Sequence, residues 1–311
     1  MVNPKFSIII PVAPWDEPKN SIKSLEKVDY PKNKFEIFLI KGTNPSRQRN
    51  EGIIKAKGEI IVFLDNDSEI PKDYLKKIEE HHKIYDIVGG PAETSNEDTF
   101  LGKCFGAVIG TYFTSQKMQA KFKGIGKLRE ATEKELILCN LSIKRETLIK
   151  YGLFNEKLYP NEENELLNNL ERNGIKAVYD PKCPIYRRQR ETLYKFSKQF
   201  FKYGKSRIEH FKEEPKNISP IFFTPAIFVL YLISLNFFNP LWYLAPLILY
   251  ILVNLTTTIT TTIEYKHPKM TLIIPFLFPL VHISYGLGIL TGIFTRKEQN
   301  KKGEIIIQKI Q

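Results

Sequence analysis

The most informative residues of this sequence are two aspartates that follow a short apolar run. Residues 60–64 are all apolar, which is typical of a buried strand, and Asp65 and Asp67 come directly after them. Side chains at i and i+2 of an extended segment point the same way, and open α/β sheets bind ligands at the carboxyl ends of their strands. Two carboxylates placed there can share a hard divalent cation such as Mg²⁺ or Mn²⁺. A solvated turn after a core strand is the alternative, because Asp and Asn are common turn residues.

A second acidic cluster, residues 160–166, opens a predicted helix that runs to Asn173 and stops at Gly174. It contains Glu162 and Glu163. Acidic side chains in a first helical turn are ordinary partners of the helix dipole, so this cluster alone does not indicate a catalytic role.

The elements that must position these acids alternate along the first part of the chain. Apolar runs predict strands, and amphipathic stretches between them predict helices. The expected strands cover residues 6–12, 35–40, 59–64, 87–91, 136–143 and 175–179; the expected helices cover 20–27, 46–57, 71–82, 100–114 and 145–151. This alternation with right-handed crossovers predicts a Rossmann-like α/β fold with a mostly parallel sheet. Residues 117–134 are basic and polar, and we expect a mobile loop beside the site that can close over substrate.

The composition changes after residue 220. The chain has 311 residues and a net charge of +12, and nearly continuous apolar sequence occupies residues 221–294. Stretches at about 221–238, 241–263 and 270–294 are each about long enough to cross a bilayer, and three in a row argue against buried helices of a soluble protein. Three scattered cysteines argue for a reducing compartment and against a disulfide framework or a zinc site. No signal peptide is visible, so the amino-terminal domain is expected in the cytoplasm, with the chain a multi-pass protein of the cell membrane.

A basic amphipathic helix is predicted from Arg187 to about Lys212. Such a helix can lie on an anionic membrane surface or pack on the domain by its apolar stripe. Nucleic acid is not expected as a partner, because no nucleic-acid motif accompanies the basic run. The predicted organisation is a catalytic domain at 1–190, an interface helix and linker at 191–218, transmembrane helices at 219–295 and a polar tail at 296–311.

The predicted spans conflict with the charge distribution. Three crossings from a cytoplasmic amino terminus would export Arg296, Lys297, Lys301 and Lys302, whereas basic segments tend to stay in the cytoplasm. Either one apolar segment is interfacial or re-entrant, or the tail is exported despite its charge.

Taken in order, these motifs resemble the family 2 glycosyltransferases with the GT-A fold, over roughly residues 5–207, and most closely the membrane-attached bacterial and archaeal members that build surface glycans. The matching stretches are Ser7–Val12, Pro45–Asn50, Lys57–Ile61, Asp65–Asp67, Cys139–Arg145, Gly152–Glu156, Glu162–Leu166 and Gln199–Tyr203. Asp65-Asn66-Asp67 matches the family's DxD motif, and Gln199 to Tyr203 resembles a relaxed QxxRW with Lys for Arg and Tyr for Trp. The acidic residue expected after the second strand is replaced by Lys41-Gly42-Thr43, and Asp16 or Glu17 could substitute for it.

The resemblance implies roles for individual residues. Asp67, assisted by Asp65, would hold Mg²⁺ or Mn²⁺. The catalytic base would be Glu163, in a Glu-Glu pair with Glu162 where the family normally has Glu-Asp. The remaining donor-binding candidates are Pro11, Ser46, Arg47, Arg49, Asn50, Asp65, Gln199, Lys202 and Tyr203.

The expected function is therefore inverting, metal-dependent transfer of a sugar from a nucleotide diphosphate sugar to a membrane-associated, polyprenyl-linked glycan acceptor. The first alternative is a polyprenyl-phosphate sugar synthase that charges the lipid phosphate itself. The second is a non-catalytic nucleotide-sugar-binding protein at the membrane. A transporter is disfavoured, because His282 is the only ionisable residue inside the apolar stretches.

Overall fold

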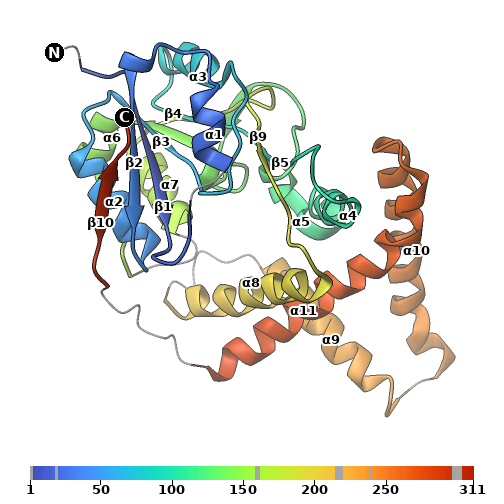
Figure 1. The fold of residues 1–311 in the computed structure, drawn as a ribbon. Helices are drawn as coiled ribbons and strands as arrows, with labels where there is room; N and C mark the ends of the chain where they lie inside the picture. The colour runs from blue at the N-terminus through green and yellow to red at the C-terminus, as the bar shows by residue number, and fades with distance from the viewer. Residues whose placement is uncertain (1–2, 18–19, 158–161, 214–219, 239, 296–302) are drawn as a thin grey trace. The chain divides into compact units, whose positions relative to one another are not determined.

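The structure is a computed structural model that describes residues 3–17, 20–157, 162–213, 220–238, 240–295 and 303–311 (Figure 1). The chain divides into two compact units. Unit 1 comprises Met1–Ser95, Ala120–Arg188 and Gln299–Gln311, and unit 2 comprises Asn96–Gln119 and Gln189–Glu298.

Unit 1 is built on an eight-stranded sheet with the order β10-β2-β1-β3-β7-β4-β8-β6. The strands are β1 (Phe6–Val12), β2 (Phe35–Lys41), β3 (Ile60–Phe63), β4 (Ile87–Gly89), β6 (Arg129–Ala131), β7 (Leu141–Lys144), β8 (Ala177–Tyr179) and β10 (Ile306–Lys309). The pairs β1–β2, β1–β3 and β4–β8 are parallel and the other four are antiparallel. Strands β1, β2, β3, β4 and β8 consequently point one way, as a mostly parallel sheet requires, while β6, β7 and β10 oppose them.

Helices cover both faces of this sheet, which explains why its strands read as continuous apolar runs. They are α1 (Asn20–Glu26), α2 (Pro45–Lys55), α3 (Tyr74–His82), α6 (Arg145–Tyr151) and α7 (Glu162–Arg172). Ile8 of β1 packs in one core cluster with Leu25 of α1 and Leu75 of α3. The next residue, Ile9, points to the other face and packs in a second cluster with Ile53 of α2. The result is the three-layer α/β arrangement that the sequence predicts.

Two short parallel strands form a second sheet, β5 (Ala92–Thr94) with β9 (Ile185–Arg187). A β-bridge joins Glu69 to Tyr186, with both backbone hydrogen bonds at 2.8 Å. The segment after β3 is thereby fastened to β9.

Three sequence predictions need correction in unit 1. The expected polar tail contains β10, which pairs antiparallel with β2 from Ile306 opposite Lys41 to Lys309 opposite Phe38. The expected loop at 117–134 contains β6, which forms the edge of the main sheet beside β8. Arg187 lies at the end of β9 and not at the start of a helix, because residues 185–187 pair with β5.

Unit 2 is helical. Its α-helices are α4 (Phe100–Ile109), α5 (Tyr112–Ser115), α8 (Leu193–Glu213), α9 (Thr224–Ser234), α10 (Ala245–Glu264) and α11 (Ile274–Phe294). Among the described residues, Leu241–Glu264 and Ile274–Phe294 are long and apolar enough to cross a membrane by length and composition. Part of the apolar stripe of α8 is covered within the unit, since Phe196 stacks on Phe105 of α4 with ring centroids 4.0 Å apart.

Candidate functional site

The two aspartates of the DxD motif lie in a tight turn directly after β3. The backbone N–H of Asp65 donates to Ser68 Oγ at 3.2 Å, and the N–H of Ser68 donates back to the Asp65 carbonyl at 3.1 Å. Ser68 is fully buried, so its hydroxyl fixes the turn from inside. The middle residue, Asn66, donates its side-chain amide to Asp16 Oδ2 at 2.6 Å. Asp16, expected as a substitute for the family's nucleotide-binding acid, thus lies beside the motif.

Arg187 binds both aspartates, and sequence analysis did not identify it as a site residue. Its Nη1 lies 3.1 Å from Asp65 Oδ2 and its Nη2 lies 3.0 Å from Asp67. The bridge between Glu69 and Tyr186 brings the arginine to this position. The single available signal in the sequence was an arginine following the apolar pair Ile185-Tyr186, which could have been read as a strand end.

On the other side of Asp65 lies Arg49 of α2. Its Nη2 is 3.4 Å from Asp65 Oδ1, and its Nη1 donates to Glu162 Oε1 at 2.8 Å. Arg49 and Glu162 are both buried. Burial raises the pKa of Glu162 to about 7, against the opposing pull of the Arg49 guanidinium.

These contacts form a row of alternating charges, Asp67–Arg187–Asp65–Arg49–Glu162. Buried or half-buried charges are tolerated only when they are paired, and the row supplies a partner to each member. It also links the DxD turn to the first residue of α7, the two acidic clusters that the sequence singled out.

Glu163, the predicted base, differs from its neighbour. It is half-buried, and among the residues that the structure describes no hydrogen bond or ion pair reaches its carboxylate. A general base needs an available carboxylate, whereas Glu162 is held by Arg49. The pair thus divides into a positioning residue and a candidate base.

The aspartates fit a divalent cation by their own geometry. Both carboxylates already approach one cationic group, the Arg187 guanidinium, within 3.1 Å. In addition, Asp67 Oδ1 is buried, and its contact among the described residues is the ion pair with Arg187 Nη2 at 3.0 Å. Carboxylate oxygens are the ligands that Mg²⁺ and Mn²⁺ prefer, so a small cation between Asp65 and Asp67 is compatible with the side chains present.

The other candidates of unit 1 have mainly structural contacts. The side chain of Asn50 bonds the backbone of Phe154 in both directions, at 2.8 and 2.9 Å, and thereby anchors the segment before α7. Arg47 Nη1 donates to the carbonyl of Gly303 at 3.2 Å. Pro11 lies within β1 opposite Ile40, and Ser46 is buried in the first turn of α2.

Gln199, Lys202 and Tyr203 belong to α8 of unit 2, not to the unit that holds the charge row. Gln199 forms a local network, since its Oε1 accepts from Arg190 Nε at 2.9 Å and its Nε2 donates to the Tyr203 hydroxyl at 2.8 Å.

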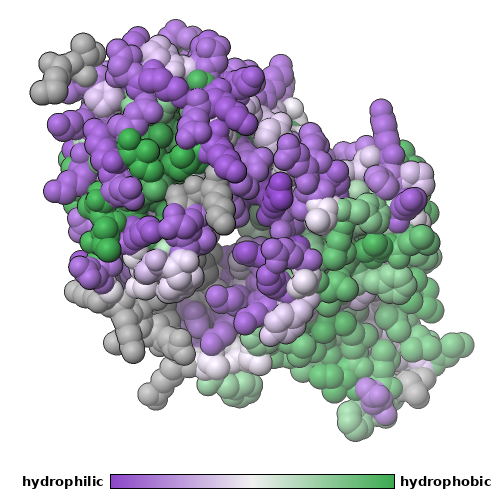
Figure 2. All heavy atoms as spheres, in the orientation of Figure 1, coloured by the Kyte–Doolittle hydropathy of each residue, from purple (hydrophilic) through white to green (hydrophobic). Residues whose placement is uncertain are grey.

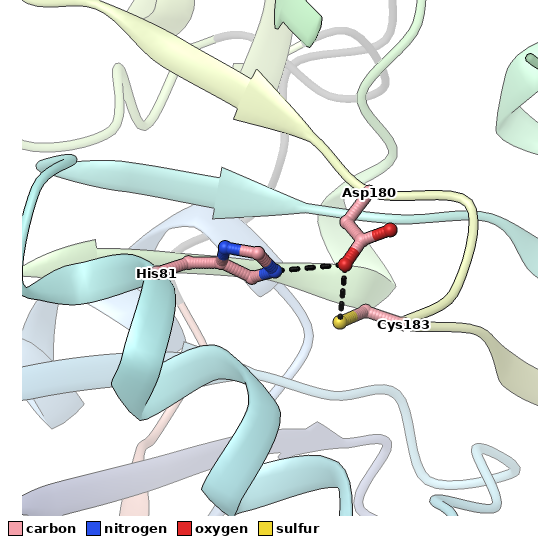
Figure 3. A group of neighbouring side chains, drawn as sticks. All are labelled: His81, Asp180 and Cys183. Carbon is pink, nitrogen blue, oxygen red and sulfur yellow. Dashed lines mark hydrogen bonds and ion pairs between the residues drawn. The ribbon is translucent and has the colours of Figure 1, made fainter. Parts of the chain in front are cut away.

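A second cluster in unit 1 groups His81, Asp180 and Cys183, whose ligand atoms lie within 4.8 Å of one another (Figure 3). Asp180 Oδ2 lies 2.7 Å from His81 Nε2 and accepts the Cys183 thiol at 3.4 Å. Burial would raise the pKa of Asp180, but hydrogen bonds from the Lys182 backbone, His81 and Cys183 hold it below its ordinary value. Burial raises the pKa of the Cys183 thiol, so the thiol stays protonated and the hydrogen bonds account for the grouping.

Part of the chain is similar to known proteins. Residues 16–128 match the sequence model of glycosyl transferase family 2, a stretch that includes Asp16, Arg49, Asp65 and Asp67. A curated relative is the poly(ribitol-phosphate) beta-N-acetylglucosaminyltransferase TarS of Staphylococcus aureus, strain Mu50, with 29% identity over 25% of this chain. The match covers 19% of that protein, so the chain spans about a fifth of the relative's length.

Two solved structures align with most of this chain. The mannosyltransferase PcManGT from Pyrobaculum calidifontis, in complex with GDP-Man and Mn²⁺, has a TM-score of 0.54 and 14% identity, covering 94% of this chain and 88% of its own. Residues 1–349 of S. aureus TarS with UDP-GlcNAc give a TM-score of 0.44 and 15% identity, covering 92% and 91% of the two chains. Over residues 16–128, which include the acidic turn after β3, the chain is similar to glycosyl transferase family 2.

Proposed function

We propose that the protein transfers a sugar from a nucleoside diphosphate sugar to an acceptor hydroxyl, with inversion at the anomeric carbon. The observation that carries this proposal is the convergence of Asp65 and Asp67 on one cationic group. The complex of the mannosyltransferase neighbour with GDP-Man and Mn²⁺ supports a donor and a cation of the same classes.

In this proposal, Asp65 and Asp67 would hold Mg²⁺ or Mn²⁺, which supplies positive charge to the diphosphate leaving group. Arg49 and Arg187 fix the orientation of Asp65 from both sides, and Asp16 is available to the nucleoside through its position beside Asn66. Arg187 lies between the aspartates, and with a cation held by Asp65 and Asp67 its guanidinium would be available to phosphate oxygens.

Glu163 would accept the proton of the acceptor hydroxyl as the new glycosidic bond forms and the bond to the diphosphate breaks. The anomeric centre passes through an oxocarbenium-like transition state in such displacements, as in glycoside hydrolysis. Glu162 keeps its ion pair with Arg49 and holds the first turn of α7, which carries Glu163, against the DxD side of the site.

We further propose that the acceptor is lipid-linked. The apolar helices of unit 2 support this choice, because anchoring an enzyme and a lipid-linked acceptor in one membrane raises their effective concentration.

Replacement of the base tests the reaction. Glu163→Gln should lower turnover about 10²- to 10⁴-fold, the usual contribution of a general base, with little change in donor binding. Glu165→Gln is the matched control, since Glu165 lies in the same helical turn and accepts a hydrogen bond from Asn155. Turnover is measured with the full chain in membranes and supplied acceptor lipid.

Two results would favour a different function. Unchanged turnover in Glu163→Gln would contradict the role of the base and favour transfer to a lipid phosphate, whose product is a lipid monophosphate sugar. Donor binding by the wild-type protein without turnover on either acceptor class would favour the non-catalytic alternative.

A further inference from the structure

The apolar helices of unit 2 differ in how much of their surface is covered by the rest of the protein. The segment from Ile221 to Ile263 contains no charged residue, and its large side chains are widely exposed, for example Leu230 at 52%, Leu249 at 63% and Ile263 at 70%. Figure 2 shows this hydrophobic surface over α10. In the most apolar 18-residue stretch of Leu241–Glu264, 17% is buried inside the protein. The corresponding share in α11 is 44%. A bilayer is the partner that fits a large, uncharged, exposed apolar surface flanked by lysines.

Helix α11 is covered along one side by α8. Ser197 and Ser284 bond through their hydroxyls at 2.8 Å, and further along Lys212 Nζ donates to the carbonyls of Gly292 and Ile293 at 2.9 Å each. The two helices therefore run parallel over the last three turns of α11. Their backbones are in close contact, because a Cβ at Gly204 of α8 would lie 2.1 Å from the Tyr285 carbonyl oxygen.

This partner of α11 is highly charged. Between its first and last turns α8 carries Lys195, Lys198, Lys202, Lys205, Arg207, Glu209 and Lys212. Charged side chains are costly inside the hydrocarbon layer, so α8 lies outside it. Helix α11 is in backbone contact with α8 from Ser284 onward, so a charged helix covers one side of its last three turns.

The first half of α11 contacts a segment of unit 2 that is flanked in sequence by unit 1 on both sides. Residues 96–119 lie between β5 and β6 in the sequence. Their longest helix, α4, has ten residues and is too short to cross a bilayer. From this segment, Phe113 packs on Phe278 and His282 of α11, and the Phe113 carbonyl lies 3.1 Å from His282 Nε2. At the preceding loop, His267 packs on Phe100 with ring centroids 4.8 Å apart.

The chain after α11 also returns to unit 1. Strand β10 pairs with β2, and Lys309 Nζ lies 2.7 Å from Glu36 Oε2. A chain that leaves unit 1 after Arg188 and rejoins its sheet must cross the membrane an even number of times. Three crossings are therefore incompatible with β10, whatever the length of the apolar segments.

We propose that α11 does not cross the membrane, although its length and composition would allow it, and that the bilayer is entered by the uncharged hairpin of residues 221–263. Lys269 before α11 and the tail that carries β10 then lie on the same membrane face as unit 1. The lysines that flank the apolar segments then all lie on the cytoplasmic face, where basic segments tend to stay. This removes the conflict between three crossings and the charge distribution.

Cysteine labelling of the full chain in its native membrane tests this topology. The native cysteines Cys104, Cys139 and Cys183 are buried, which gives a low background to an impermeant maleimide. Single cysteines are placed at Lys269 before α11, at Glu304 before β10, and at Glu26 of unit 1 as the reference; all three positions are exposed. A fourth is placed at Phe237, which is 87% exposed at the tip of the hairpin.

Inside-out and right-side-out vesicles are labelled in parallel. Lys269→Cys and Glu304→Cys should react in the same vesicle orientation as Glu26→Cys, whereas Phe237→Cys should react in the opposite orientation or be protected by lipid. Reaction of Lys269→Cys or Glu304→Cys in the opposite orientation to Glu26→Cys would overturn the proposal. So would reaction of Phe237→Cys together with Glu26→Cys, since the hairpin would then not enter the bilayer.

Discussion

Arg187 stands where a divalent cation would stand, between Asp65 and Asp67. In the proposed site, the affinity for a cation would therefore depend on the arginine as well as on the aspartates. Burial alone would lower the pKa of Arg187, but Cys139, Asp67 and Asp65 raise it well above its ordinary value. The arginine stays charged at every working pH, so a competing cation, and not a proton, must release the aspartates.

Removal of this competing charge should strengthen metal binding. Arg187→Ala should bind Mn²⁺ without donor about tenfold or more tightly, because one unit charge about 4 Å away is worth about 4 kcal/mol at an effective dielectric constant of 20. Titration calorimetry measures the affinity, and Arg188→Ala, the exposed neighbour, is the control. Weaker Mn²⁺ binding in Arg187→Ala would show that the arginine supports the metal site and does not compete for it.

The buried carboxyl of Glu162 should give the stability a particular pH dependence. The pKa of Glu162 is near 7 in the folded protein, against an ordinary glutamate value of 4.5, so the folded state binds more protons than the unfolded state between these values. The stability of the wild type relative to Glu162→Gln should therefore fall as the pH rises through this window, by up to about 3 kcal/mol. Thermal unfolding of the solubilised full chain at about pH 5 and about pH 8 measures it. A relative stability that rises with pH would mean that Arg49 holds Glu162 ionised.

At the level of elements, the sequence predicted what local pattern determines. Strands β1 and β2 and helices α2 and α6 lie within a few residues of their expected ranges, because apolar runs and the amphipathic stretches between them are local signals. Strand β10 was missed because residues 306–309 become a strand only through pairing with β2, which is distant in sequence. The position of Arg187 depends in the same way on the bridge between Glu69 and Tyr186.

The pairing of β10 makes a prediction about stability. Lys309 neutralises Glu36, a buried carboxyl that also accepts from Ser7 Oγ at 2.6 Å and from the Lys57 N–H at 2.7 Å. Lys309→Met should lower the free energy of unfolding by about 1–3 kcal/mol, since one partner of a buried charge is lost. Burial raises the pKa of Glu36 but the three partners lower it overall, so this loss should be present at neutral pH and disappear at acid pH.

Chemical denaturation of the solubilised protein measures this loss, with Lys55→Met on the exposed side of α2 as the control. Equal stability of Lys309→Met and Lys55→Met at neutral pH would show that the ion pair between Lys309 and Glu36 adds nothing to the stability of the protein.

At the scale of the whole molecule, the sequence predicted two kinds of region but not how the chain is divided between them. Composition changes only once, near residue 220, which suggested consecutive domains. The structure instead assigns residues 96–119 to the helical unit and residues 299–311 to the sheet unit. These assignments rest on packing, such as Phe113 on Phe278 and β10 on β2, which no local window reports.

Donor binding as a function of Mn²⁺ shows whether Asp65 and Asp67 bind the donor through a divalent cation. Full-length protein is titrated with UDP-, GDP- and dTDP-sugars with and without the ion, alongside Asp67→Asn. Asp29→Asn, which alters an exposed aspartate paired with Lys76, is the control. The wild type and Asp29→Asn should bind one donor class in the presence of Mn²⁺ only, and Asp67→Asn should lose this binding. Donor binding by Asp67→Asn with the metal dependence of the wild type would contradict the account.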